Sequence, residues 1–275
     1  MKSQTKLAWV AAGLSMGAAT LAGAGVFVKK KISGLEPDLP SVDADTALLF
    51  QFAYSPYCVK VRYCLEFKQI PYKVVELTPL IHSSFSQRFS GQRKVPYIQH
   101  QDKIIADSSA IALYLEEYSP SPALFPADAQ LREDVLLLED WIDESLQPAL
   151  ARLAYLYYYN HPEIVVKNSD LKTGMPILEP LKPILTPPMI RRAMFKMGVS
   201  PQDGPRLEVR LWEIMRLLEA RLENKDYLVG GQLSLADLSL ASALSVLDRL
   251  PWLAEHPKMR WLLDWRTVIL NEINR

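Results

Sequence analysis

The chain has 275 residues, of which 31 are Lys or Arg and 31 are Asp or Glu, and 49% of it is apolar. This length and apolar content fit one large domain or two small ones with a hydrophobic core, and they argue against a disordered chain. A formal net charge of zero argues against a nucleic-acid partner, because nucleic-acid-binding domains carry a clustered basic excess. Two cysteines cannot build a disulfide framework, and four scattered histidines without zinc-ligand spacing indicate no metal site.

Residues 1–46 are predicted to form a hydrophobic anchor and a linker. The stretch Leu7–Val28 has no charged residue, and a helix of this length would span about 33 Å, enough for a hydrocarbon core of about 30 Å. We expect a retained single-pass N-terminal membrane anchor, with the rest of the chain facing the cytosol. A cleaved signal peptide remains the alternative, because Ala22-Gly23-Ala24 fits a cleavage site. The polar residues 32–46 are predicted to be the linker.

Residues 47–120 alternate between strand-like and helix-like patterns. The predicted strands are 47–53, 72–77, 97–100 and 103–106, and the predicted helices are 57–69, a short one after residue 77, and 109–117. The order β-α-β-α-β-β-α within about 70 residues is that of a thioredoxin-like α/β unit.

Four short motifs occur at matching places in this pattern. They are Ser55-Pro56-Tyr57-Cys58, Lys94-Val95-Pro96, Asp107-Ser108-Ser109-Ala110-Ile111 and Ser234-Leu235-Ala236-Asp237. Together they resemble the cytosolic-type glutathione S-transferase superfamily from about residue 47 to residue 275. The first three, with the stretch from Ser55 to Pro79, also resemble membrane-associated prostaglandin E synthase type 2. The resemblance implies a thioredoxin-like glutathione-binding domain at 47–120 and an all-helical domain at 121–275.

Ser55 is the predicted catalytic residue. A Ser-Pro pair is a favourable helix start that needs no function, so the residues alone leave both interpretations open. The resemblance implies that the Ser55 hydroxyl donates a hydrogen bond to the glutathione thiolate. Ionising a thiol of pKa about 8.5 at pH 7 needs roughly 2.7 kcal/mol. One hydrogen bond to a charged group contributes about 1.5–3 kcal/mol and a helix terminus about 0.3–1 kcal/mol, so the two suffice.

The predicted glutathione-binding residues follow from the same resemblance. Val95-Pro96 matches the family's cis-proline, whose preceding backbone pairs with the cysteinyl part of glutathione. Asp107 and Ser108 are expected to bind the γ-glutamyl group at a helix N-terminus, and Lys94 the glycyl carboxylate. Plain N-capping explains Asp107 equally well, and family members usually have Glu or Gln there.

The cysteines point to a second kind of chemistry. Glutaredoxins and the prostaglandin synthase type have a nucleophilic cysteine where this chain has Ser55, and a hydroxyl cannot form a mixed disulfide. Cys58 falls in the first helical turn, where a thiol pKa can be lowered. The alternative is that Cys58 and Cys64 are small core residues, and at about 9 Å apart on one helix they are too distant to form a disulfide.

The C-terminal part is predicted to be helical, with one exception. A helical pattern over 127–159 ends in four tyrosines, which either line the electrophile site or pack in the core. A second helix is expected at 206–223, and Ser234-x-x-Asp237 forms a capping signature. The Pro-rich insertion 168–205 contains a cationic, apolar run at 189–197. It is interpreted as a lid, a membrane-surface segment or an irregular excursion.

These observations predict a transferase that uses glutathione as co-substrate, of the kind that serves detoxification. In this hypothesis the thiolate attacks a small hydrophobic electrophile. The alternatives are a glutathione-dependent isomerase or peroxidase acting on lipid peroxides, and a non-catalytic interaction protein that keeps the fold. Family members are often homodimers, and the sequence identifies no interface.

Overall fold

The computed structural model describes residues 37, 39–78, 82–167 and 180–274. Its first part holds a four-stranded sheet in the order β2-β1-β3-β4. The strands are β1 (Ala47–Gln51), β2 (Tyr72–Glu76), β3 (Tyr97–His100) and β4 (Lys103–Ala106). The helices between and after them are α2 (Pro56–Phe67), α3 (His82–Ser90) and α4 (Ser108–Tyr118). β1 runs parallel to β2 and antiparallel to β3, which confirms the predicted thioredoxin-like unit.

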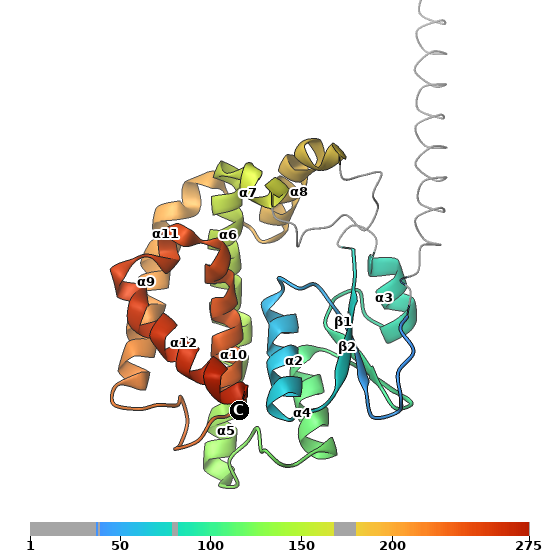
Figure 1. The fold of residues 1–275 in the computed structure, drawn as a ribbon. Coiled ribbons are helices and arrows are strands. Elements are labelled where there is room, and N and C mark those ends of the chain that lie inside the picture. The colour runs from blue at the N-terminus through green and yellow to red at the C-terminus, as the bar shows by residue number, and fades with distance from the viewer. Residues whose placement is uncertain (1–36, 38, 79–81, 168–179, 275) are drawn as a thin grey trace, which may run out of the picture.

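The central strand β1 is buried along its whole length because helices cover both faces of the sheet. Successive strand residues point to opposite faces. Ala47 and Leu49 therefore join the core that includes α2 and α4, whereas Leu48 and Phe50 pack with Phe85 of α3 on the other face. Figure 1 shows α2 and α4 between the sheet and the helical part of the chain.

The second part of the chain is helical. Its helices are α5 (Ala129–Trp141), the π-helical turn η1 (Ile142–Leu146), α6 (Gln147–Asn160), α7 (Pro162–Lys167), α8 (Lys182–Lys196), η3 (Pro201–Asp203), α9 (Gly204–Leu222), α10 (Leu235–Ala243), η4 (Leu244–Arg249), α11 (Pro251–Ala254), η5 (Pro257–Met259) and α12 (Arg260–Ile273). All nine residues of α10 are buried, and this helix packs against α2 (Figure 1). The predicted helical C-terminal part is thus confirmed over the residues that the structure describes.

The capping signature before α10 forms as predicted. The Asp237 carboxylate accepts hydrogen bonds from the backbone N–H of Ser234 (2.9 Å) and from its hydroxyl (2.8 Å). Its other oxygen accepts one from the N–H of Leu228 (2.8 Å). Burial raises the pKa of Asp237 to about 6, although these hydrogen bonds lower it. The motif therefore stabilises the start of α10, whose residues are all buried.

Two helical predictions need correction. The pattern over 127–159 is not one α-helix, because the π-helical turn η1 separates α5 from α6. The second concerns the insertion, whose residues 182–196 form the regular helix α8 and not an irregular excursion. Pro187 and Pro188 lie inside this helix, but Ile190 and Met194, one turn apart, bury their side chains and hold it against the core.

The predicted membrane localisation also needs correction. None of the helices in the part of the chain that the structure describes is long and apolar enough to cross a bilayer. The expected anchor, residues 7–28, lies outside the described residues. The single-pass localisation therefore has no support in the structure, and it is withdrawn.

Candidate functional site

The turn from β1 into α2 places Ser55 at the N-cap of α2, with Pro56 as the first helical residue. The Ser55 backbone is extended, and its carbonyl accepts the N–H of Val59 at 2.9 Å. Its side chain caps no backbone N–H of α2. The hydroxyl is therefore not committed to the backbone of α2, and Ser55 is one of the residues that line the pocket described below.

Side chains behind this turn hold it in place. The Arg62 guanidinium on α2 donates to the Gln51 side chain (2.5 Å) and to the Ala53 carbonyl (3.1 Å). Glu76 at the end of β2 accepts hydrogen bonds from the Ala53 N–H (2.7 Å) and from Gln51 (3.0 Å). The backbone just before Ser55 is thus fixed from both β2 and α2.

The other predicted binding residues lie at the same end of the sheet as Ser55. The register pairs Phe50, at the end of β1, with Tyr97, and Tyr97 with Ala106 of β4. Pro96 and Asp107 directly adjoin these paired residues. The Val95–Pro96 peptide is cis, as expected, and the Asp107 N–H donates to the Pro96 carbonyl at 3.3 Å.

Asp107 is the N-cap of α4. One of its carboxylate oxygens accepts from the N–H groups of Ser109 (3.0 Å) and Ala110 (3.2 Å), so the plain capping interpretation holds. Its φ of +84° is rare for a residue other than glycine, and such conformations cluster at functional sites. Ser108 is buried, whereas Asp107 and Lys94 are exposed.

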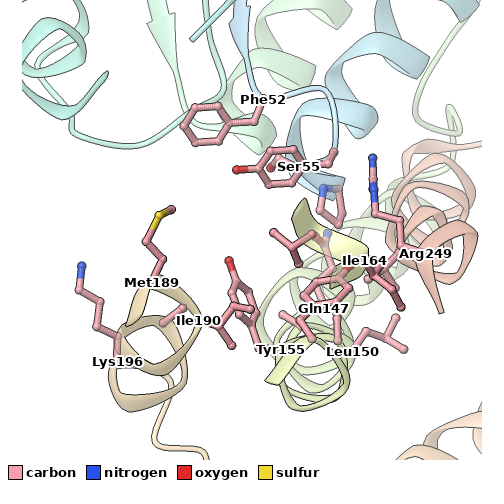
Figure 2. Close-up of a pocket in the computed structure, with 18 of the residues that line it drawn as sticks. Phe52, Ser55, Gln147, Leu150, Tyr155, Ile164, Met189, Ile190, Lys196 and Arg249 are labelled. Carbon is pink, nitrogen blue, oxygen red and sulfur yellow. The ribbon is translucent and has the colours of Figure 1, made fainter. Parts of the chain in front are cut away.

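A pocket of about 570 Å³ opens beside Ser55 (Figure 2). Its walls come from the β1–α2 turn, from α6, α7 and α8, and from the segment around η4. The apolar and aromatic lining residues include Phe52, Tyr54, Leu150, Tyr155, Tyr158, Ile164, Met189 and Ile190. Among the predicted site residues, only Ser55 lines this pocket; Lys94, Val95, Pro96, Asp107 and Ser108 do not.

The four tyrosines at the end of α6 divide between the two expected roles. Tyr155 and Tyr158 line the pocket, whereas Tyr157 contacts His161 and Trp252, and Tyr159 contacts Arg191. Burial raises the pKa of Tyr158 to about 12, and burial also raises that of Tyr155. Both phenols therefore stay neutral at physiological pH and can donate hydrogen bonds into the pocket.

The cysteines behave as core residues. Burial raises the pKa of the Cys58 thiol to about 11. Hydrogen bonds with the Phe52 backbone and the Ser55 side chain lower this pKa, but by less than burial raises it. Burial likewise raises the pKa of Cys64 to about 12. A lowered pKa for Cys58 is therefore wrong, because desolvation outweighs the helix N-terminus.

A buried ionic network behind the pocket was missed by sequence reasoning. The Lys60 ammonium on α2 contacts Glu139 of α5 (2.5 Å) and Asp143 of η1 (2.6 Å), and Lys60 is fully buried. Asp143 also accepts a hydrogen bond from Gln147, a pocket residue, at 2.7 Å. Its backbone carbonyl accepts one from the hydroxyl of Tyr57 at 2.9 Å. The network thus ties the sheet part of the chain to the helical part directly behind Ser55.

The sequence carries a signal for this network. Glu139, Asp143 and Gln147 recur every four residues, which places them on neighbouring parts of one helix face. Burial raises the pKa of Asp143 to about 6, although Lys60 lowers it. Asp143 and Glu139 together raise the pKa of Lys60 despite its burial. One ammonium therefore stays charged between two carboxylates.

A thioredoxin-like sheet joined to a helical part, with a pocket between them at the β1–α2 turn, defines the class of this protein. The model for the N-terminal domain of glutathione S-transferase matches residues 49–123, and the model for the C-terminal domain matches residues 186–272. Together they match more than half of the chain. The chain belongs to the glutathione S-transferase superfamily, a family that uses glutathione as co-substrate.

Curated relatives resemble parts of the chain. Prostaglandin E synthase 2 of Danio rerio is 34% identical over 31% of this chain and 23% of its own length. Maleylacetoacetate isomerase of Rattus norvegicus is 31% identical over 39% of this chain and 52% of its own length. The matches thus span at most about half the length of these relatives.

Solved structures share the fold. A glutathione S-transferase from Rhodospirillum rubrum is 22% identical with a TM-score of 0.59, covering 81% of this chain and 87% of that one. One from Methylobacterium radiotolerans, in complex with glutathione sulfonate, is 19% identical with a TM-score of 0.53, covering 83% and 88%. At these identities the likeness shows the architecture alone.

Proposed function

We propose that this chain is a glutathione-dependent transferase in which Ser55 activates the glutathione thiol. The observation that carries the proposal is the place of Ser55, whose hydroxyl caps no backbone group at the N-terminus of α2 and which lines a largely apolar pocket. A thiolate beside this hydroxyl receives a charge-assisted hydrogen bond and lies near a helix N-terminus. Both interactions favour the ionised form of the thiol.

Residues 47–120 are proposed to bind glutathione along one end of the sheet. The backbone of Val95 before the cis peptide pairs with the cysteinyl part, as a short antiparallel strand would. The γ-glutamyl group binds at the start of α4, where Ser108 supplies donors and Asp107 accepts from the ammonium group. Lys94, in the exposed loop before Val95, is proposed to contact the glycyl carboxylate.

In the proposed reaction the thiolate sulfur attacks an electrophilic carbon of a substrate held in the pocket. A C–S bond forms, and the leaving group departs with its electron pair. The thiol proton passes to solvent when the thiolate forms. Tyr155, which rises from α6 into the pocket in Figure 2, is placed to donate a hydrogen bond to a substrate oxygen. The apolar walls exclude water from the reacting sulfur.

The test is Ser55→Ala with glutathione and 1-chloro-2,4-dinitrobenzene. Loss of one hydrogen bond to a thiolate, worth about 1.5–3 kcal/mol, is expected to lower kcat/KM by roughly 10- to 150-fold. The pH at which the rate is half-maximal should rise by about 1 to 2, because the thiol ionises less readily. Ser84→Ala, at an exposed position on α3, is the matched control. An unchanged rate and pH profile in Ser55→Ala would remove Ser55 from this role.

A glutathione-dependent isomerase or lipid-peroxide peroxidase is the second candidate, and the two curated relatives named above support it. An isomerase would return glutathione unconsumed, a peroxidase would oxidise it, and a transferase would incorporate it into the product. Product analysis with unsaturated carbonyl compounds and lipid peroxides separates the three. Absence of glutathione binding in calorimetry would contradict all of them and favour a non-catalytic protein.

A further inference from the structure

One face of α8 forms a wall of the pocket beside Ser55. Met189, Arg192, Ala193 and Lys196 all line the pocket, and their spacing of three, four and seven residues places them on one side of the helix. The first part of this face is apolar, whereas Arg192 and Lys196 lie one turn apart near its end. In Figure 2 Met189 and Lys196 project from α8, across the pocket from Phe52 and Ser55.

The charge of the pocket has one sign. Arg192, Lys196 and Arg249 are its charged lining residues, and no Asp or Glu occurs among the described residues that line it. Arg192 and Lys196 are exposed, and neither forms an ion pair with a described carboxylate. Arg249 lies on the other side of the pocket, 5.7 Å from the centre of the Tyr54 ring. The α8 pair therefore offers two cations to whatever occupies the pocket.

We propose that the pocket binds amphipathic anions: substrates with an apolar body and a carboxylate, the carboxylate held between Arg192 and Lys196. The apolar body then extends along Met189, Ile190 and Tyr155 toward Ser55. An uncharged apolar electrophile would leave both cations unpaired, whereas a carboxylate pairs with both at the open side of the pocket. The reaction of such a substrate rests on the proposed function, but its binding does not.

The expected effect is moderate because both cations are exposed. An exposed ion pair changes an equilibrium by up to about fivefold, so two that converge on one carboxylate change it by up to about 25-fold. Exposed charges are screened over about 10 Å at 0.1 M salt, so the preference must weaken as the salt concentration rises.

The test measures binding of 6-phenylhexanoate and of its neutral isostere 6-phenylhexanamide by calorimetry. The full chain should prefer the carboxylate, and the preference should shrink between about 0.05 M and about 0.5 M salt. Arg192→Gln/Lys196→Gln should lose about 5- to 25-fold in affinity for the carboxylate and almost none for the amide. Arg191→Gln is the control. Arg191 lies on the same helix as Arg192 and Lys196, but it contacts Tyr159 and does not line the pocket.

Equal affinity for the two probes in the unmodified chain would overturn the proposal, as would equal loss for both in the double variant. Repeating the measurement in Ser55→Ala separates this inference from the proposed function. A carboxylate preference without any transfer activity would leave the binding inference standing and contradict the transferase. Transfer activity without a carboxylate preference would contradict the binding inference and leave the transferase standing.

Discussion

Replacing Lys60 by Met tests the ionic network that joins the two parts of the chain. Methionine keeps most of the length of the side chain but removes the ammonium group, which lies 2.5 Å from Glu139 and 2.6 Å from Asp143. Both carboxylates then remain buried without a cation. Lys60 itself does not line the pocket, so the substitution acts on the pocket only through the network.

The magnitude follows from these distances. At an effective dielectric constant of about 20, each contact carries a gross attraction of about 6 kcal/mol. Desolvation of the three groups cancels much of that sum, and breaking a buried pair from one side costs about 3–5 kcal/mol. We expect Lys60→Met to lower the free energy of unfolding by this amount near neutral pH.

The loss should depend on pH. In the unmodified chain the folded-state pKa of Asp143, about 6, lies above its ordinary value of 3.8. The stability that its proton supplies is therefore present below about pH 4 and is lost as the pH rises through about 6. Without Lys60 the Asp143 carboxyl group loses an interaction that lowers its pKa, so it holds its proton to higher pH. The variant should consequently be much closer to the unmodified chain at about pH 5 than at about pH 8.

Urea unfolding at these two pH values, followed by circular dichroism, measures the effect. Lys225→Met, at an exposed position, is the matched control and should change little. Adding Glu139→Gln and Asp143→Asn to Lys60→Met should recover part of the lost stability, because no uncompensated charge remains. A loss below about 1 kcal/mol, or an equal loss at both pH values, would refute the reasoning.

Three further predictions concern the core and the pocket. Asp237→Asn weakens the three hydrogen bonds at the start of α10 and should lower the free energy of unfolding by about 2–4 kcal/mol. Calorimetry would show this as a lower Tm, and an unchanged Tm would contradict the role of the cap. Cys58 and Cys64, with thiol pKa values of about 11 and 12, should resist Ellman's reagent at neutral pH until urea unfolds the chain, and rapid native labelling would contradict their burial. Ala193→Trp should raise KM for bulky electrophiles and leave glutathione affinity unchanged. The control Val209→Trp, at an exposed position, should change neither quantity. Equal KM values in the two variants would mean that α8 does not shape the substrate site.

Much of the fold was predictable because its signals are local. The strands at 97–100 and 103–106 have the predicted bounds, since a short apolar alternation flanks a polar Gln101-Asp102 pair. The cap at Ser234 and Asp237 is equally local. The helix α8 was not predicted, because its prolines argue against a helix and its stabilising contacts come from distant parts of the chain.

The candidate site also has a part that the sequence predicts and a part that it does not. Ser55, Pro96 and Asp107 belong to short motifs next to strand ends, so their place at one end of the sheet follows from the order of the strands. The network of Lys60 depends on residues about 80 positions away, and no local pattern specifies which lysine becomes buried. The pairing of Lys60 with these carboxylates therefore depends on how the sheet part and the helical part pack together.

The wider turn η1 has a consequence for how the pocket is built. Each residue of an α-helix advances the side chains by about 100° around the axis, and the π-helical turn takes up one residue more than an α-helical turn, which offsets α6 from an uninterrupted continuation of α5 by about one such step. The offset sets which side of α6 faces the pocket relative to the side of α5 that carries Glu139 toward Lys60. Deleting one residue from this turn would convert it to an ordinary α-helical turn and leave the two faces in nearly the same relation, whereas inserting one residue would rotate one face against the other by about 100°. With that insertion the helix would keep either its contact with α2 or its wall of the pocket, but not both.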